Sequence, residues 1–150
     1  IPQEAKRLLD LGTGGGFPGI PLAILYPDSQ FTLLDSTAKK IRVAENVCKE
    51  LKLSNVRLVN KRIEEEKTQY DFIVSRAVTE FNNFVKLTFK NLNRSGNNDP
   101  DSGIIYLKGG DFEKELGKYR DSVQIWEIKD FFSEPYFETK KIIHLPSSEI

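Results

Sequence analysis

Several residue types are scarce in this sequence, and each scarcity excludes a class of protein. The single cysteine, Cys48, rules out an internal disulfide and is compatible with a reducing compartment. The single histidine, His144, has no partner at metal-ligand spacing and leaves no serine–histidine–aspartate triad, so we expect neither a metal site nor a hydrolase. No apolar run approaches the length of a membrane span and no signal peptide is visible, which favours a cytoplasmic protein.

A net charge is also missing, because 22 basic residues balance 22 acidic ones. The balance is not uniform along the chain. Residues 38–62 hold eight basic residues and only two acidic ones, a local excess that can serve as a contact for RNA. The alternative interpretation is a charged helix face that simply contacts water.

The length of 150 residues suits one domain with a core of its own, and we expect a single catalytic domain over residues 1–150. The chain begins with Ile1, contains no methionine and reaches its first apolar run within a few residues. We interpret this as a trimmed chain from which the natural N-terminal part is missing.

The most informative stretch is residues 8–19, where an apolar run ends in an acid and a glycine-rich turn leads to Pro18. Glycines allow a tight turn close to a ligand, and proline is well tolerated in the first turn of a helix. The spacing Gly14-x-Gly16-x-x-Gly19 matches the dinucleotide fingerprint. The spacing Asp10-x-Gly12-x-Gly14-x-Gly16 is the pattern of S-adenosylmethionine (SAM) methyltransferases, so the turn alone leaves both ligand classes open.

Short apolar strands alternate with amphipathic helices through most of the chain, which predicts a doubly wound α/β sheet that is mostly parallel. The tail alternates apolar and polar residues without a convincing helix and predicts an antiparallel hairpin at the sheet edge. Dinucleotide-binding halves normally continue with parallel units, so the hairpin favours the class I SAM-methyltransferase architecture. The expected strands are residues 7–11, 31–34, 56–59, 71–75, 104–107, 123–128 and 136–145, and the expected helices start at Pro18 and cover residues 38–52, 80–92 and 112–118.

Five strings of the sequence are informative together: residues 10–23, with Gly-Phe-Pro-Gly-Ile-Pro at 16–21, Leu-Asp-Ser at 34–36, Lys-Arg-Ile-Glu-Glu at 61–65, Ser-Arg-Ala-Val at 75–78 and Leu-Lys-Gly at 107–109. From about Lys6 to Glu115, and more loosely beyond, the chain resembles one family, the bacterial small-subunit ribosomal RNA guanine-N7 methyltransferase, also called glucose-inhibited division protein B. The resemblance implies SAM as cofactor, N7 of a guanine in the 530 loop of 16S ribosomal RNA as target, and RNA or the small ribosomal subunit particle as partner. Members of the family carry a helical N-terminal extension, which we expect to be missing from this chain.

Asp35 follows the second strand, where a carboxylate can accept both hydrogen bonds of a ribose diol. The alternative is an N-cap for the helix of residues 38–52. Gly12, Gly14 and Gly16 are expected to let the backbone approach the methionine part of the cofactor. Phe17 is expected to form a wall of the pocket, with core packing as its alternative.

By resemblance, Ile63 and Glu64 hold the adenine, the first through backbone and apolar contact and the second near the exocyclic amine. Glu64 also opens a run of three glutamates, so the start of a solvated helix is its alternative role.

Arg76 directly follows the fourth strand, at the sheet edge where open α/β proteins bind ligands. We expect it to bind cofactor and, with Arg62 and Lys108, to position the cofactor carboxylate or an RNA phosphate. The alternatives are an ion pair of Arg76 with Asp10 or Glu64, and a solvated strand-end lysine for Lys108. A further expectation is that Asp35 and Arg76 converge on one adenosyl pocket.

The target base is expected to be splayed out and stacked on an aromatic residue, with Tyr106, Phe112 and Phe81 as candidates. Two other functions stay open at this point: a nucleotide-binding or RNA-binding module without turnover, and a nicotinamide oxidoreductase domain. The oligomeric state is not indicated by the sequence, and a monomer is the default expectation.

Overall fold

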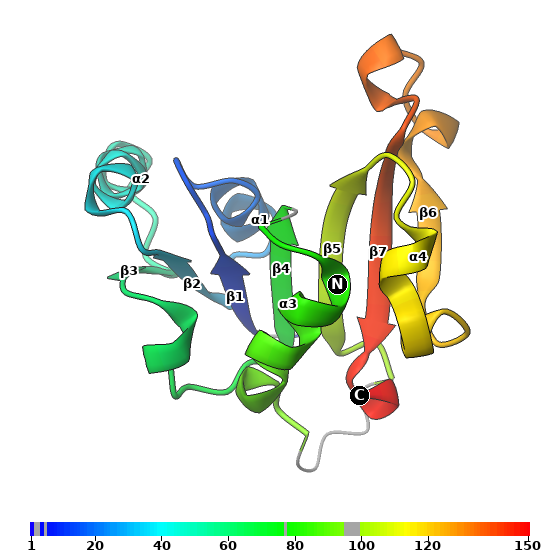
Figure 1. Cartoon of the computed structure of the whole chain (residues 1–150). Helices are drawn as coiled ribbons and strands as arrows, with labels where there is room; N and C mark the ends of the chain where they lie inside the picture. The colour runs from blue at the N-terminus through cyan, green and yellow to red at the C-terminus, as the bar shows by residue number, and fades with distance from the viewer. Residues whose placement is uncertain (2–3, 5, 77, 95–99) are drawn as a thin grey trace.

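The computed structural model describes residues 1, 4, 6–76, 78–94 and 100–150. Ala77 of the Ser-Arg-Ala string therefore lies outside the described residues. One sheet of seven strands runs through the described chain in the order β3-β2-β1-β4-β5-β7-β6 (Figure 1). The strands are β1 (Arg7–Leu11), β2 (Gln30–Asp35), β3 (Val56–Asn60), β4 (Phe72–Arg76), β5 (Gly103–Gly109), β6 (Gln124–Glu127) and β7 (Lys140–Pro146).

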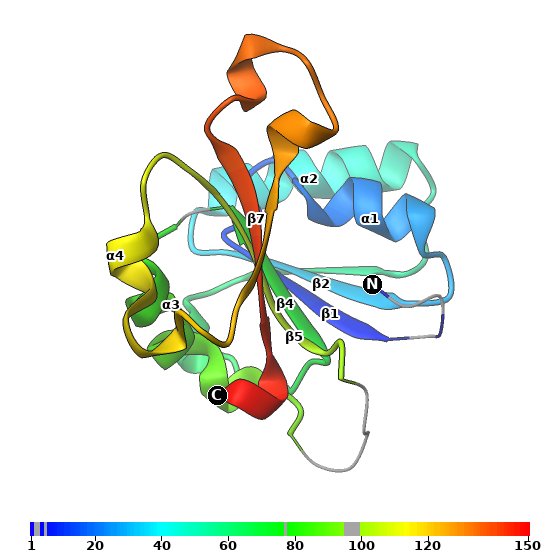
Figure 2. The same ribbon diagram turned by 90° about the vertical axis from the view of Figure 1, so that its right-hand side faces the viewer.

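Helices cover both faces of the sheet (Figures 1 and 2). The first two lie together on one face and the last two lie on the other. This layering follows from the strand pattern, because neighbouring residues of a strand point to opposite faces. Leu8 packs in the apolar cluster that contains Ile20 and Ala44, whereas Leu9 packs in the cluster that contains Phe81 and Phe84. The helices are α1 (Gly19–Leu25), α2 (Ala38–Glu50), α3 (Phe81–Thr88) and α4 (Glu113–Leu116).

The antiparallel hairpin at the end of the chain is confirmed, and its second strand lies inside the sheet. β7 pairs antiparallel with both β5 and β6, so it separates them. Because β6 runs in the same direction as β1 to β5, the β6–β7 connection lies at the edge where the parallel strands end. Figure 2 shows this connection projecting from the top of the molecule.

The boundaries differ from expectation at two places. The last strand begins at Lys140 because Pro135–Phe137 form a 3₁₀ helix, and the helix predicted for residues 80–92 ends as a 3₁₀ turn at Phe89–Asn91. Cys48 is buried on α2, and His144 is buried on β7. No helix in the described part of the chain has the length and apolar character that a membrane span requires.

Candidate active site

The glycine turn after β1 is shaped by contacts inside the protein. Gly12 has φ +72° and a Cβ there would lie 2.5 Å from the Val78 Cγ1 atom. Gly16 has φ +110° and a Cβ there would lie 2.2 Å from the Ile20 Cδ1 atom. Side chains rarely adopt these backbone angles, and both positions lack room for one. The glycines are therefore needed to fold the turn.

Asp10 lies beneath this turn and is fully buried. Its Oδ2 atom accepts hydrogen bonds from the Thr13 hydroxyl at 2.6 Å and from the Gly19 N–H at 2.8 Å. Its Oδ1 atom has no hydrogen-bond partner among the described residues. Burial raises the pKa of Asp10 from 3.8 to about 6, although the two hydrogen bonds and the Arg76 charge act in the opposite direction.

The raised pKa of Asp10 predicts a pH dependence of stability. The folded state holds the proton more tightly than the unfolded state, so stability falls as the pH rises from about 4 to above 6. An Asp10→Asn variant keeps an acceptor for Thr13 and Gly19 but carries no charge. At each pH, the quantity of interest is the free energy of unfolding of Asp10→Asn minus that of wild type. We expect this difference to be larger at pH 8 than at pH 4 by roughly 2 kcal/mol. Urea denaturation at both pH values measures this, and a difference that does not change with pH would contradict the buried charge.

Asp35 ends β2 and contacts the glycine turn from the side of α2. Its Oδ2 atom accepts the Gly14 N–H and its Oδ1 atom accepts the Thr37 N–H, both at 2.9 Å. The alternative role as N-cap of α2 is wrong, because Thr37 occupies that position. Each carboxylate oxygen has a second lone pair that remains available to a ligand.

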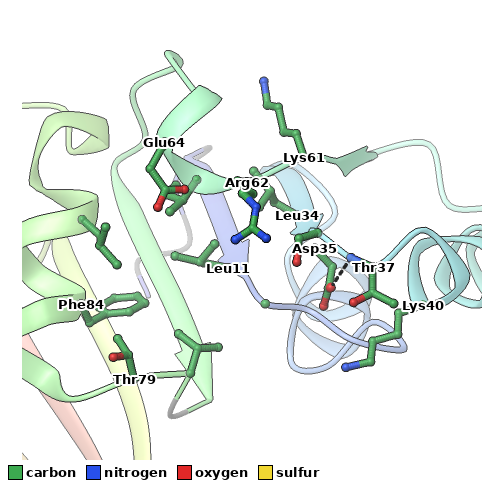
Figure 3. A pocket seen from close by; sticks show the side chains of 15 residues that line it. Leu11, Leu34, Asp35, Thr37, Lys40, Lys61, Arg62, Glu64, Thr79 and Phe84 are labelled. Carbon is green, nitrogen blue, oxygen red and sulfur yellow. Dashed lines mark hydrogen bonds between the residues drawn. The ribbon is translucent and has the colours of Figure 1, made fainter.

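A cavity of about 430 Å³ lies beside Asp35, and we name it the Asp35 cavity. Figure 3 shows Asp35 and Glu64 on opposite sides of this hollow, with Arg62 between them in the view. Apolar side chains make up much of the remaining wall, which suits the flat face of a nucleobase. The lining residues are Leu11, Gly12, Leu34, Asp35, Ser36, Thr37, Lys40, Lys61, Arg62, Ile63, Glu64, Val78, Thr79, Phe84 and Leu87.

Ile63 and Glu64 lie on a 3₁₀ turn that follows β3. Ile63 is buried and Glu64 is exposed, and both line the Asp35 cavity. The predicted adenine-holding pair therefore lies in the same hollow as the predicted ribose-binding carboxylate. The two acids and Ile63 line one cavity whose remaining wall is partly apolar, so the residues present fit an adenosyl group.

Arg76 ends β4 and contacts the glycine turn from the other side. Its Nε atom donates a hydrogen bond to the Phe17 carbonyl oxygen at 2.9 Å. Among the described residues no ion pair joins Arg76 to Asp10 or to Glu64, so neither alternative for Arg76 is present. Arg76 and Asp35 hold the same turn from opposite sides.

Arg76 lines a second cavity of about 290 Å³, which we name the Arg76 cavity. Lys108 lines it too, and its ammonium group pairs with the Glu115 carboxylate, so the solvated-lysine alternative is wrong. The expectation of one shared pocket is not met here, since Asp35 lines one cavity and Arg76 the other. The residues of the Arg76 cavity are Arg76, Leu107, Lys108, Gly109, Ile128, Tyr136, Phe137, Lys140 and Lys141.

Other predicted site residues are placed differently from expectation. Arg62 lies in the Asp35 cavity, apart from Arg76 and Lys108. Phe17 is 56% exposed, so its core-packing alternative is wrong, and it lines neither cavity. Gly14 and Gly16 also line neither cavity, although Gly14 binds Asp35 through its N–H.

The prediction that Tyr106, Phe112 or Phe81 stacks on the target base is wrong, because all three side chains are buried. Tyr106 and Phe81 are 0% exposed and Phe112 is 1% exposed, because they form the core beneath α3 and α4. A side chain packed on all sides has no ring face for a nucleobase. Three exposed aromatic residues, Phe131, Phe132 and Tyr136, lie instead in the β6–β7 connection.

The basic residues of the stretch 38–62 include two groups, one paired with a buried carboxylate and one exposed on α2. Lys61 and Arg57 lie 2.9 Å and 3.9 Å from the carboxylate of Glu66, which is almost fully buried. Burial opposes ionisation of Glu66, but the Lys61 ammonium and the Thr68 N–H outweigh it and lower its pKa to about 2. The basic residues of α2 are exposed, and Lys40 among them lines the Asp35 cavity.

Solved structures of SAM-dependent methyltransferases share this fold. A SAM-dependent methyltransferase from Aquifex aeolicus aligns with a TM-score of 0.65 at 16% identity, over 94% of this chain and 82% of that one. PKMT2 from Rickettsia typhi in complex with AdoHcy aligns with a TM-score of 0.60 at 22% identity, over 73% of this chain and 22% of that one. The fold is that of the class I SAM-dependent methyltransferases.

Sequence comparison then identifies the family. Residues 1–142 match the family described as GidB, rRNA small subunit methyltransferase G. The ribosomal RNA small subunit methyltransferase G of Christiangramia forsetii is 49% identical over 144 residues, which cover 96% of this chain and 68% of that protein. The protein of the same name from Cytophaga hutchinsonii is 45% identical over 145 residues, 97% of this chain and 70% of that protein. The chain belongs to the rRNA small subunit methyltransferase G family, which sets aside the nicotinamide oxidoreductase alternative.

Proposed function

We propose that residues 1–150 form the catalytic domain of a cytoplasmic enzyme that transfers a methyl group from SAM to N7 of a guanine in the 530 loop of 16S ribosomal RNA. One observation carries the cofactor assignment: Asp35, Ile63 and Glu64 surround a single cavity beside the glycine turn. Family membership supports the substrate. Within the described residues no group of three or more metal-ligating side chains comes together, and the proposed reaction needs none.

The chemistry of the target restricts what the protein has to supply. Guanine N7 carries a free lone pair, so no proton has to be removed before it attacks the methyl carbon. When bound, SAM supplies a methyl group on a positively charged sulfur that is a good leaving group. An arginine stays protonated at any relevant pH, so Arg76 cannot be a base. We infer that Arg76, Arg62 and Lys108 act by holding groups in place, and that alignment of the two reactants provides most of the rate.

The nucleoside-binding residues have separate tasks in this proposal. Asp35 accepts hydrogen bonds from the ribose hydroxyls, which a 2′-phosphate in the same place would not permit. Ile63 contacts the adenine ring and Glu64 accepts a hydrogen bond from its amine. The exposed lysines and arginine of α2 attract the RNA backbone toward the mouth of the Asp35 cavity, where Lys40 lies.

Two measurements test this proposal. Calorimetry should detect binding of S-adenosylhomocysteine and no binding of NAD. Labelled methyl groups should be transferred to small-subunit particles or to deproteinised 16S RNA, and the modified guanine is mapped by strand scission at 7-methylguanosine. RNA that carries 7-deazaguanosine at the target position should accept no methyl group. Binding of S-adenosylhomocysteine without any transfer would instead favour an RNA-binding module without turnover.

A further inference from the structure

The Arg76 cavity has no assigned ligand, and its walls combine positive charge with aromatic surface. Four of its nine lining residues are basic and none is acidic. Two of the four are neutralised by nearby carboxylates: Lys108 pairs with Glu115, and the Lys141 Nζ atom lies 3.5 Å from Glu127 Oε1. In the described part of the chain, Arg76 and Lys140 have no carboxylate within ion-pair distance. The cavity therefore presents two cations that form no ion pair among the described residues.

Two aromatic residues, Tyr136 and Phe137, line the same cavity and form its aromatic wall. Tyr136 is 71% exposed and its ring centroid lies 5.2 Å from that of Phe137, nearly perpendicular to it. Phe137 in turn lies 5.1 Å from Phe132, so neighbouring rings support the wall. The Lys140 Nζ atom lies over the Tyr136 ring, 4.9 Å from its centroid, which places a cation on one face of a largely exposed ring. A planar aromatic ligand that carries negative charge matches this combination.

The pairing of β5 with β7 brings the basic residues of the Arg76 cavity together. Gly109 pairs with Lys140 and Lys108 pairs with Lys141, so the basic residues of both strands meet at one sheet edge. A Cβ on Gly109 would lie 2.8 Å from the Lys140 Nζ atom, so only glycine leaves the lysine this position. Arg76 reaches the same cavity from β4 while it holds the Phe17 carbonyl of the turn. The cavity therefore lies on the far side of Arg76 from the Asp35 cavity.

We propose that the Arg76 cavity binds the target nucleotide of single-stranded RNA, with its base stacked on Tyr136 and its phosphate held by Lys140 and Arg76. This proposal rests on the proposed function and names the residues that receive its substrate. The volume of about 290 Å³ is at the lower end of small-molecule sites, which run from roughly 300 Å³ upward, and suits one nucleotide. Stacking and backbone charge recognise an unpaired nucleotide without reading N7, so the attacking atom stays free.

The first test measures the stacking contact. Fluorescence anisotropy follows binding of a labelled single-stranded RNA with the sequence of the target loop, in the absence of cofactor. We expect Tyr136→Ala to weaken RNA binding roughly tenfold or more, and Tyr136→Phe to bind like wild type because the ring face remains. Phe131→Ala is the matched control, since Phe131 is 69% exposed on the same connection and does not line the cavity. Equal losses for Tyr136→Ala and Phe131→Ala would overturn the assignment to the cavity.

The second test measures the phosphate contact. Lys140→Gln should weaken RNA binding roughly tenfold and reduce the slope of log affinity against log salt by about one. Lys114→Gln, an exposed lysine of α4 away from the cavity, is the control and should change neither quantity. An unchanged salt slope for Lys140→Gln would overturn its role as a phosphate contact.

Failure of this inference can be told apart from failure of the proposed function. Calorimetry with S-adenosylhomocysteine should give the wild-type affinity for Tyr136→Ala and Lys140→Gln, because neither residue lines the Asp35 cavity. If wild type methylates RNA and both variants bind RNA and methylate it equally well, the Arg76 cavity is not the nucleotide site and the proposed function stands. If wild type binds no S-adenosylhomocysteine and transfers no methyl group, the proposed function itself is wrong.

Discussion

Replacement of Asp35 by alanine is expected to weaken binding of S-adenosylhomocysteine by roughly 100-fold. A hydrogen bond to a charged group contributes about 1.5–3 kcal/mol, and each 1.4 kcal/mol corresponds to a factor of ten. The variant also loses the bonds that Asp35 accepts from Gly14 and Thr37, so the turn is held less firmly. Calorimetry measures the dissociation constant. Asp28→Ala, at an exposed aspartate in the turn before the same strand, should bind like wild type.

The two effects of the Asp35→Ala substitution can be separated with a modified ligand. The 2′-deoxyribose analogue of S-adenosylhomocysteine lacks one of the two hydroxyls that the Asp35 carboxylate would bind. Its contacts with the glycine turn should be the same as those of the parent compound. We expect wild type to bind the deoxy analogue roughly tenfold more weakly than the parent, and Asp35→Ala to bind the two equally. If the variant discriminates as strongly as wild type, Asp35 shapes the turn and does not bind the ribose.

Replacement of Arg76 by alanine is expected to lower kcat/KM for methyl transfer by roughly 100-fold. The variant loses the Nε hydrogen bond to Phe17 and one of the four basic side chains of the Arg76 cavity. Because the reaction depends on alignment, a small displacement of either reactant costs a large share of the rate. Arg76→Lys keeps the charge and loses the bond to Phe17, so its activity should lie between those of wild type and Arg76→Ala.

Separate binding measurements show which reactant Arg76 holds. A loss of RNA affinity in Arg76→Ala, with the S-adenosylhomocysteine affinity retained, identifies a phosphate contact, whereas the reverse result identifies the cofactor carboxylate. Arg120→Ala is the control, because Arg120 forms an exposed ion pair with Glu113 away from both cavities. If Arg76→Ala retains full turnover and unchanged affinities for both reactants, Arg76 has no role in the mechanism.

Much of the fold could be predicted because its signals are local. The expected first strand, residues 7–11, matches β1, and the helix over residues 38–52 was placed to within two residues. Both depend on the spacing of apolar residues within a single element. The order of acid, glycines and proline likewise predicted a tight turn between a strand and a helix, and the chain turns there between β1 and α1, because the requirements of that turn lie within a few residues of the chain.

Much of the Asp35 cavity was also predictable, because the carboxyl ends of parallel strands lie at the same edge of a sheet. Asp35, Arg62, Ile63 and Glu64 follow β2 and β3, so the pairing of these two strands brings them together. The wall formed by Val78, Thr79 and Phe84 was not predicted. These residues follow β4, and their position depends on how the chain leaves that strand and enters α3.

The amino-acid pattern was sufficient to determine the class of fold, the glycine turn and one side of the Asp35 cavity, because apolar periodicity and turn chemistry act between near neighbours. The tertiary structure alone decided that β7 lies between β5 and β6, which sets Lys140 opposite Gly109 and forms the Arg76 cavity. It also decided that Tyr106 is buried while Tyr136 is exposed. Strand order and burial depend on how distant segments together remove apolar surface from water, and no local pattern contains that information.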